Sequence, residues 1–270
     1  MGRCETMADP TVEIAQLWKS YDGTPALQGL SLRAAPGEIV GLIGPNGAGK
    51  TTTLKILVGL LRPDAGVVRV LGRDVLADPV GYKAAIGYMP ELPTLPDYLT
   101  AAEFLGYVGR IRGMPRSGLG ARTRELLRGL DLAPKADETI ASLSKGMKAK
   151  LAFAAATIHD PDLLILDEPL IGVDPAGQHK LKEHLVGVAR AGGTILVSTH
   201  QLDTAERLCS RVAIVHHGRD VATGDLAGLR GLAQASGDSS LEAVFLKLTQ
   251  ETPASMEPER PRPRGWFRRG

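Results

Sequence analysis

The spacing of hydrophobic residues changes along this chain, and each spacing predicts a type of element. Strand-like runs, alternating or continuously apolar, occur at 11–17, 28–35, 38–43, 66–71, 86–89, 163–167, 194–199 and 211–216. Apolar residues at helical spacing occur at 53–61, 100–113, 117–130, 144–159, 176–190, 202–209, 225–233 and 240–248. Thr100 and Glu103 predict a capping box at the start of the second of these helices. The first two strands can pair across Asp22-Gly23. From 163 onward strand and helix alternate, which indicates a parallel sheet with crossover helices.

The composition narrows the class of protein. The chain has 270 residues and 43% hydrophobic content, which suffices for one large or two small domains. A net charge of +2 is too close to neutral to indicate nucleic-acid binding by itself. The two cysteines, Cys4 and Cys209, lack metal-ligand spacing and suggest a reducing compartment. No apolar run reaches the roughly 18 residues of a membrane span, so we expect none in this chain.

A glycine-rich segment with the sequence GPNGAGKTT occupies residues 44–52, between a predicted strand and a predicted helix. Its glycines permit a tight loop whose N–H groups point at an anion. Lys50 can reach the outer phosphates of a nucleotide, and Thr51 offers a hydroxyl to Mg²⁺. A chance match is the alternative, but both flanking elements are of the required type. The segment therefore predicts binding of a nucleoside triphosphate.

The predicted strand at 163–167 ends in two adjacent carboxylates, Asp167 and Glu168. A parallel strand delivers its last residue to the carboxyl edge of the sheet, where ligands bind in open α/β folds. Asp167 can hold Mg²⁺ opposite Thr51. Glu168 can polarise a water for attack on the terminal phosphate. The alternative, an acidic surface turn, is disfavoured because four apolar residues lead into the pair.

Four motifs in a fixed order carry a resemblance to a known family. The phosphate loop is followed by LSKGM at 143–147, then LDEP at 166–169, then a lone histidine, His200, after a strand. This combination resembles the ATP-binding-cassette (ABC) ATPases over about 12–231. The resemblance implies ATP and Mg²⁺ as cofactors and ATP hydrolysis as the reaction.

The resemblance also implies site residues. Those implied to bind ATP are Tyr21, Asn46, Gly47, Ala48, Gly49, Lys50, Thr51, Thr52, Ser144 and Gly146. Tyr21 matches a residue that stacks on adenine, with an ordinary strand aromatic as the alternative. Ser144 and Gly146 match positions that contact the terminal phosphate bound by the opposite subunit.

The remaining implied residues perform or coordinate hydrolysis. The implied catalytic residues are Glu168, His200 and Lys50, and the implied Mg²⁺ ligands are Thr51, Asp167 and Glu91. His200 matches the histidine that holds Glu168 and the water, although a lone histidine is more often structural. Asp174 matches the loop that couples the two ATP sites of a dimer.

The sequence departs from the family pattern at three positions. Lys145 and Met147 replace a glycine and a glutamine of the usual signature, LSGGQ. Glu91 stands where most of the family has a glutamine that senses Mg²⁺ and faces the membrane subunit. These variants, with the segment at 241–249, resemble a bacterial branch whose partners are ABC-2-type membrane subunits, often exporters.

The resemblance implies an α/β P-loop NTPase fold: a RecA-like core, an N-terminal antiparallel β subdomain and an inserted α-helical subdomain. We predict a disordered leader (1–9), an ABC domain (10–233) with its helical subdomain at about 93–158, a C-terminal helix (234–250) and a disordered basic tail (251–270). The expected partners are a second copy or a homologous ATPase subunit, and separate ABC-2-type membrane-spanning permease subunits. The expected location is the cytoplasmic face of a bacterial cell membrane, and no direct nucleic-acid partner is expected.

Other interpretations stay open. The first is a soluble ABC ATPase acting on nucleic acid, ribosomes or metal-cluster assembly. Such proteins usually carry paired cassettes, coiled-coil insertions or extended basic surfaces, none of which appears in this sequence. A subunit without turnover is disfavoured because the predicted catalytic residues are all present. The N-terminal MGRCET fits an N-myristoylation pattern or a short leader. The five tail arginines around Trp266-Phe267 indicate either a solvated tail or contact with an anionic membrane surface.

Overall fold

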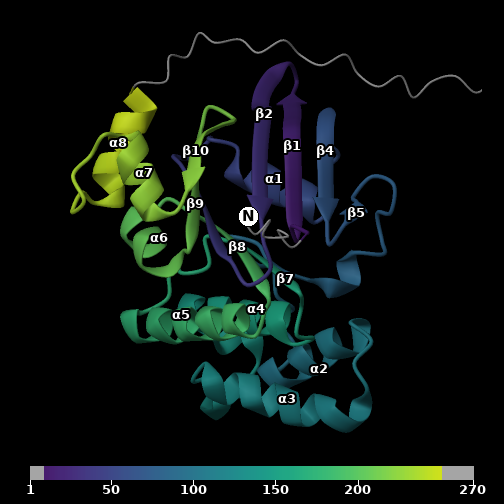
Figure 1. Ribbon diagram of the computed structural model, residues 1–270. Coiled ribbons are helices and arrows are strands. Elements are labelled where there is room, and N and C mark those ends of the chain that lie inside the picture. Colours follow the sequence, from purple (N-terminus) through teal and green to yellow (C-terminus); the bar gives the residue numbers. More distant parts are fainter. Residues whose placement is uncertain (1–8, 251–270) are drawn as a thin grey trace, which may run out of the picture. The chain divides into compact units, whose positions relative to one another are not determined.

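The computed structural model describes residues 9–250, so the N-terminal lipidation pattern and the arginine-rich tail lie outside the described residues. The chain divides into two compact units (Figure 1). The first unit comprises the described residues up to Lys83 together with those from Ser198 onward. The second unit is the intervening segment, Ala84–Val197.

The first unit contains an antiparallel sheet of order β2-β1-β4-β5 and a group in which β9 lies between β3 and β10. The strands of the antiparallel sheet are β1 (Val12–Tyr21), β2 (Thr24–Ala34), β4 (Ala65–Val70) and β5 (Arg73–Asp74). The other group consists of β3 (Ile39–Ile43), β9 (Arg211–His216) and β10 (Arg219–Gly224). β1 pairs with β2, as predicted, and also with β4, so Val12 lies opposite Ala34 on one side and Val70 on the other.

Four helices complete the first unit: α1 (Lys50–Leu57), α6 (Leu202–Leu208), α7 (Leu226–Leu232) and α8 (Leu241–Gln250). The last three lie together beside β9 and β10 (Figure 1) and share a buried apolar cluster with β3, which includes Ile43, Ile214 and Leu241. Cys209, at the end of α6, belongs to the edge of this cluster. Burial raises the pKa of its thiol to about 12, and its Sγ would lie 2.8 Å from a Cβ placed on Gly41.

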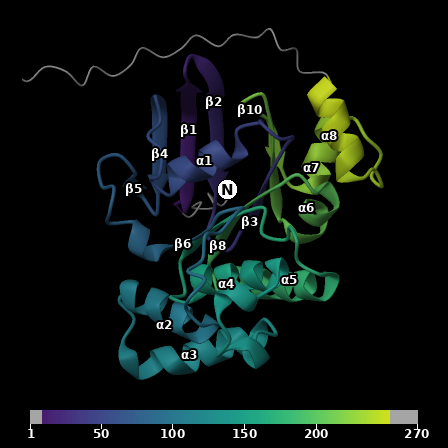
Figure 2. The ribbon, with the colours of Figure 1, turned by 180° about the vertical axis from the view of Figure 1, so that it is seen from behind.

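The second unit combines a parallel strand pair with four helices. β6 (Ile86–Met89) pairs in parallel with β7 (Leu163–Asp167), all of whose residues are buried. The helices are α2 (Ala101–Ile111), α3 (Arg116–Gly129), α4 (Lys145–Thr157) and α5 (Pro175–Arg190). Figure 2 shows α2 and α3 side by side within this unit. β8 (Thr194–Thr199) contains the boundary between the two units.

Helix caps explain several of these boundaries. At the start of α2 the Thr100 hydroxyl accepts from the Glu103 N–H at 3.1 Å, and the Glu103 carboxylate accepts from the Thr100 N–H at 2.9 Å. The predicted capping box is therefore confirmed. Ser144 and Asp174 cap α4 and α5 through one bond each, accepted from the Met147 and Gly177 N–H groups. Among residues 9–250 no helix has the combined length and apolar content that crossing a bilayer requires.

The predicted bounds hold for the strands at 86–89, 163–167, 194–199 and 211–216. The predicted helix at 53–61 is wrong at both ends. α1 begins at Lys50, because the last loop residues already form its first turn, and it ends at Leu57. Gly59 has φ +69°, a left-handed conformation that does not continue a helix. The strand β10 was not predicted from the sequence.

Candidate functional site

The glycine-rich segment at 44–52, here called the phosphate loop, joins the end of β3 to the start of α1. Gly47 and Gly49 adopt φ values of +80° and +104°, which favour glycine. Gly44 has a different reason to be glycine, because a Cβ there would lie 2.2 Å from the Val215 carbonyl oxygen. The loop is thus built by backbone conformation and by close packing against β9.

Lys50 is the first residue of α1, and its side chain is buried, with 6% exposed. Its Nζ donates to the Gly44 carbonyl at 2.6 Å and to the Pro45 carbonyl at 3.2 Å, so the side chain folds back over the loop. The ammonium group is therefore held at the loop that precedes a helix N-terminus, where backbone N–H groups and the helix dipole favour an anion. Thr51 and Thr52 follow in the first turn of the helix.

Two other predicted residues lie in the first unit. Tyr21 ends β1 with 44% of its surface exposed, so a face of the ring is accessible for stacking. The Lys19 ammonium lies 5.8 Å from the centre of that ring. His200 follows directly after β8 and is exposed. Beside it the Gln201 N–H donates to the Thr199 hydroxyl at 3.0 Å, just ahead of α6.

The adjacent carboxylates lie in the second unit, at the end of β7. Asp167 and Glu168 are both buried, with 2% and 7% exposed. Burial and the Asp167 charge together raise the pKa of the Tyr88 hydroxyl to about 12. Glu168 has φ +50°, a conformation uncommon for residues other than glycine. Because such strain persists mainly where the surrounding structure imposes it, this residue is a functional candidate. Glu91 is exposed, shortly after β6.

The predicted signature and coupling residues are brought together within the second unit. Ser144 caps α4, and a Cβ on Gly146 would lie 2.8 Å from the Gly172 carbonyl oxygen. Asp174 caps α5, and the bond from the Gly177 N–H is the main reason that the pKa of its carboxyl is lowered. The buried Lys150 of α4 places its Nζ 3.5 Å from the Asp174 carboxylate. The start of α4 and the start of α5 are therefore in direct contact.

Comparison with known proteins identifies the family. A family model described as "ABC transporter" matches residues 27–171. This chain belongs to the ABC transporter family. It is 41% identical over 218 residues to a Nod factor export ATP-binding protein I of Paraburkholderia xenovorans, covering 81% of this chain and 72% of that protein. It is 37% identical over 225 residues to the daunorubicin/doxorubicin resistance ATP-binding protein DrrA of Streptomyces peucetius, covering 83% and 68%.

A solved structure titled as an ATP-binding subunit of an ABC transporter superposes with a TM-score of 0.84 at 36% identity, covering 88% of this chain and 99% of that one. The predictions of an ABC ATP-binding subunit, of its ATPase activity and of the P-loop α/β fold are thereby confirmed. The predicted ABC site residues are divided between the two units. The first unit holds the phosphate loop, Tyr21 and His200, and the second holds the remaining residues.

Lys150 is a residue that sequence reasoning missed in this ABC subunit. It lies six positions after Ser144 on a helix face that is otherwise apolar, where an unpaired ammonium would be costly to bury. A lysine among Ala149, Leu151 and Ala152 was the available signal. Its pairing with Asp174 could not be seen without the fold, because the two residues lie on different helices.

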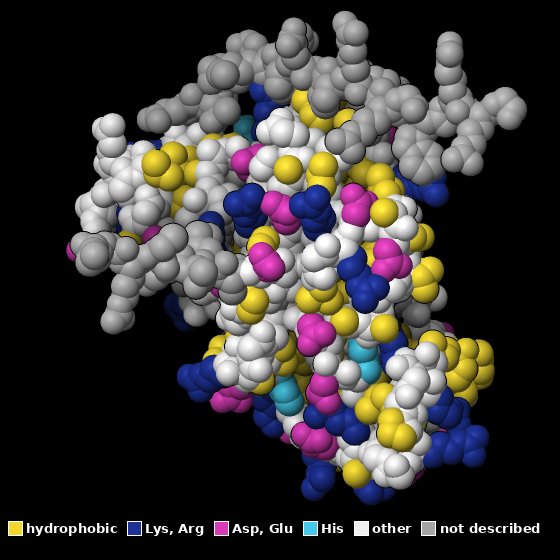
Figure 3. Space-filling model, turned by 45° about the vertical axis from the view of Figure 1, so that its right-hand side comes forward, with side chains coloured by type: hydrophobic (Ala, Val, Ile, Leu, Met, Phe, Trp, Pro, Cys, Tyr) yellow, Lys and Arg dark blue, Asp and Glu magenta, His cyan; other side chains and the backbone are white. Residues whose placement is uncertain are grey.

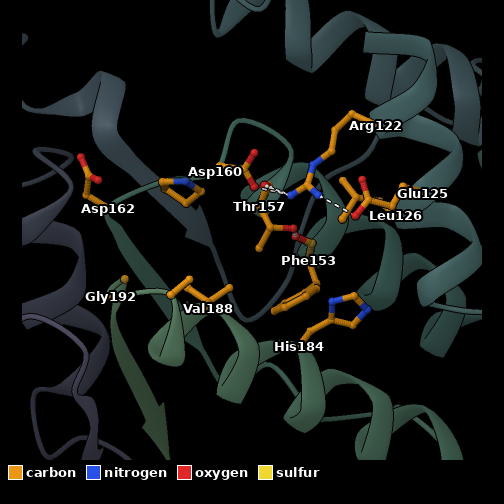
Figure 4. Close-up of a pocket in the computed structure, with 13 residues that line it drawn as sticks. Arg122, Glu125, Leu126, Phe153, Thr157, Asp160, Asp162, His184, Val188 and Gly192 are labelled. Atoms are coloured by element: carbon orange, nitrogen blue, oxygen red, sulfur yellow. Dashed lines mark hydrogen bonds and ion pairs between the residues drawn. The ribbon is translucent and has the colours of Figure 1, made fainter. Parts of the chain in front are cut away.

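A pocket of about 360 Å³ lies in the second unit, among α3, the end of α4 and α5 (Figure 4). Several of its polar groups have protein partners: Arg122 pairs with Asp160 and with Glu125, and the Thr157 hydroxyl donates to the Phe153 carbonyl. None of the predicted ATP or Mg²⁺ residues lines it. On the face shown in Figure 3, basic and acidic side chains of the described residues are interspersed.

Proposed function

We propose that this ATPase powers export through separate membrane-spanning subunits of the ABC-2 type, at the cytoplasmic face of the membrane. Two relatives, at 41% and 37% identity, support this proposal, because one is named for export and the other for drug resistance. The observation that carries the ATP-driven part is the phosphate loop, in which left-handed glycines and a buried lysine precede a helix N-terminus.

We assign the contacts with the chain's own ATP to residues of the first unit. The N–H groups of Asn46 to Thr52 and the Lys50 ammonium would bind the phosphates, and Tyr21 would stack on adenine. The Thr51 hydroxyl of the first unit and the buried Asp167 carboxylate of the second are each an oxygen donor of the kind that Mg²⁺ prefers, so we assign both residues as ligands of the ion. The ion would neutralise charge on the outer phosphates. Glu91, exposed shortly after β6, is assigned as a further oxygen donor that would help hold the ion.

Hydrolysis requires a group that orients water. Glu168 follows Asp167 directly and has a left-handed backbone conformation that is uncommon for residues other than glycine. We assign it as the base that positions the attacking water. His200, which follows β8 and is exposed, is assigned to help orient the attacking water.

Two copies would complete the ATP sites. Ser144 is exposed at the N-terminus of α4, so it is available to a nucleotide held by another chain. Asp174, paired with Lys150, would link the two sites of the dimer. ATP binding would close the dimer, and hydrolysis would reopen it.

The second unit exposes large apolar side chains that suit contact with a membrane subunit. Tyr107 and Ile111 lie one turn apart on the same face of α2, with 50% and 66% exposed. Leu92 and Tyr98, on the segment that follows Glu91, are 75% and 81% exposed. Such exposure of large apolar residues is typical of interaction surfaces. Co-purification with a multi-spanning membrane protein tests this assignment, and its loss in a Tyr107→Ser, Ile111→Ser variant would support it.

The experiment that tests the proposed chemistry is Glu168→Gln in the full chain. We expect ATP affinity to be kept and turnover to fall by about 10² or more, because the amide cannot act as a base. ATP-bound dimers should accumulate, because closure is kept while hydrolysis is lost. Glu183→Gln, the same exchange at an exposed position of α5, is the matched control and should leave turnover unchanged. Wild-type turnover in Glu168→Gln would refute the assignment.

A further inference from the structure

The outer side of the phosphate loop is held by a hairpin turn far away in the sequence. β9 and β10 are joined by the two residues His217 and Gly218, with φ values of +47° and +77°. Two successive positive φ values are typical of the type I′ turn of a tight hairpin. The Gly218 N–H donates to the Ala48 carbonyl at 3.0 Å. The turn therefore contacts the middle of the phosphate loop, and both belong to the first unit.

This bond fixes the direction of a neighbouring N–H group. The Ala48 carbonyl and the Gly49 N–H belong to one planar trans peptide, so they point in opposite directions. Because the carbonyl is bonded to the turn, the Gly49 N–H is directed away from the turn. That is the inner side of the loop, where a bound phosphate would accept from it.

Gln28 of β2 holds the turn in place through three hydrogen bonds, one from its backbone and two from its side chain. Its backbone N–H donates to the Gly218 carbonyl at 2.8 Å, and its Nε2 donates to the His217 carbonyl at 3.0 Å. Its Oε1 accepts from the Arg219 guanidinium at 3.0 Å. One glutamine thus bonds to three successive residues of the hairpin.

The packing around these bonds leaves little room for movement. A Cβ on Gly49 would lie 2.8 Å from the Ala26 carbonyl oxygen, and a Cβ on Gly218 would lie 2.6 Å from the same atom. The same Cβ on Gly218 would lie 2.9 Å from the Leu27 Cα. The loop, the turn and β2 are therefore in contact through backbone atoms, which cannot rotate away as a side chain can.

We propose that Gly218 and Gln28 are positioning residues of the ATPase, which hold the Gly49 N–H toward the phosphates of ATP by fixing the Ala48 carbonyl. The proposal rests on the assignment of the phosphate loop as the ATP site. It predicts that disturbing the turn weakens binding of ATP although neither residue contacts the nucleotide.

The test compares two glycines in matched turns. Gly218→Ala places a Cβ against β2 and shifts the turn. Gly72→Ala is the control, because Leu71 and Gly72 also form a two-residue turn with φ values of +51° and +74°, but a Cβ on Gly72 meets no atom within 4 Å. Both variants carry the same left-handed alanine. We expect Gly218→Ala to raise the Kd for MgATP about tenfold over Gly72→Ala, measured by calorimetry on the full chain.

A second variant covers the case in which Gly218→Ala does not fold. Gln28→Ala removes the two side-chain bonds but keeps the backbone bond, and it should raise the Kd for MgATP about threefold. Thermal unfolding of all three variants serves as the check on stability. Gly218→Ala and Gln28→Ala should have a higher Kd than Gly72→Ala even where their Tm is the same. Unchanged affinity in the folded variants overturns the proposal. Wild-type chain that does not bind ATP, or binds no better than Lys50→Ala, instead overturns the assignment of the loop.

Discussion

The phosphate loop and the contact between α4 and α5 are built by different means. The phosphate loop depends on backbone atoms: glycines at left-handed φ, and carbonyls of β2 and β9 that leave no space for a Cβ. Around the contact between α4 and α5 side chains contribute more: the pair between Lys150 and Asp174 joins the two helices, and Ser144 and Asp174 each cap their own helix. A region built from backbone should tolerate almost no substitution, whereas a region built from side chains should respond in proportion to the bond removed.

The largest effect is expected from Gly44→Ala, which would break the backbone-built region. Its Cβ would lie 2.2 Å from the Val215 carbonyl oxygen, so the loop must move away from β9. A displacement of that size should cut ATP turnover by about 10² or more. Gly187→Ala, in α5 with no atom within 4 Å, is the control and should raise stability by about 0.5–1 kcal/mol. Turnover of Gly44→Ala within a few-fold of wild type would show that the loop has more freedom than its packing indicates.

The next test asks whether the two regions serve different nucleotides. A Ser144→Arg chain and a Lys50→Ala chain should each be inactive alone. Mixed, they should recover roughly a quarter of wild-type turnover, because about half of the pairs are mixed and each keeps one intact site. ATPase assays on the mixture and on both parents decide this. A mixture no more active than its parents would contradict a site shared between two copies.

A smaller effect is expected from Lys150→Met, which tests how much the contact between α4 and α5 depends on the pair between Lys150 and Asp174. The variant keeps the buried stem but removes the charge beside Asp174. We expect turnover to fall about fivefold, the range found when a residue that couples two sites is changed. Lys148→Met, on the same helix as Lys150, removes a pair with Asp97 and should change turnover by less than about twofold. An equal fall in turnover in the two variants would contradict a specific role for the pair between Lys150 and Asp174.

The smallest effect concerns Asp220, which lies on β10 close to the turn that holds the phosphate loop. Burial raises the pKa of its carboxyl above 3.8, although the hydrogen bond that it accepts from the Ser31 N–H lowers the pKa in part. A raised pKa in the folded state gives stability that is present below about pH 4 and is lost as pH rises through the folded pKa. Asp220→Asn should therefore be as stable as wild type near pH 4 and slightly more stable at pH 7. Thermal unfolding at several pH values measures this, and a pH-independent difference would contradict it.

The sequence predicted the parts of the site that are written in local patterns. The phosphate loop, the carboxylates after β7 and the capping box at Thr100 each occupy a few successive residues. The support of the loop could not be predicted, because Gln28, Ala48 and Gly218 come from three distant segments. β10 was missed because its residues are half-buried and mostly polar or small, so they show no alternation. Lys150 was missed because most residues around it on α4 are apolar and buried, so the helix shows no polar face that would single the lysine out.

Cys209 gives the molecule a practical property. Burial raises the pKa of this thiol to about 12, so very little of it is thiolate at pH 7, and the thiolate is the nucleophile that attacks alkylating reagents. The described residues therefore contain a native cysteine that needs no replacement before a spectroscopic label is attached elsewhere. After Cys4→Ser, one engineered cysteine in each unit could carry a pair of probes. The separation between the two units could then be followed in real time as ATP is added and consumed.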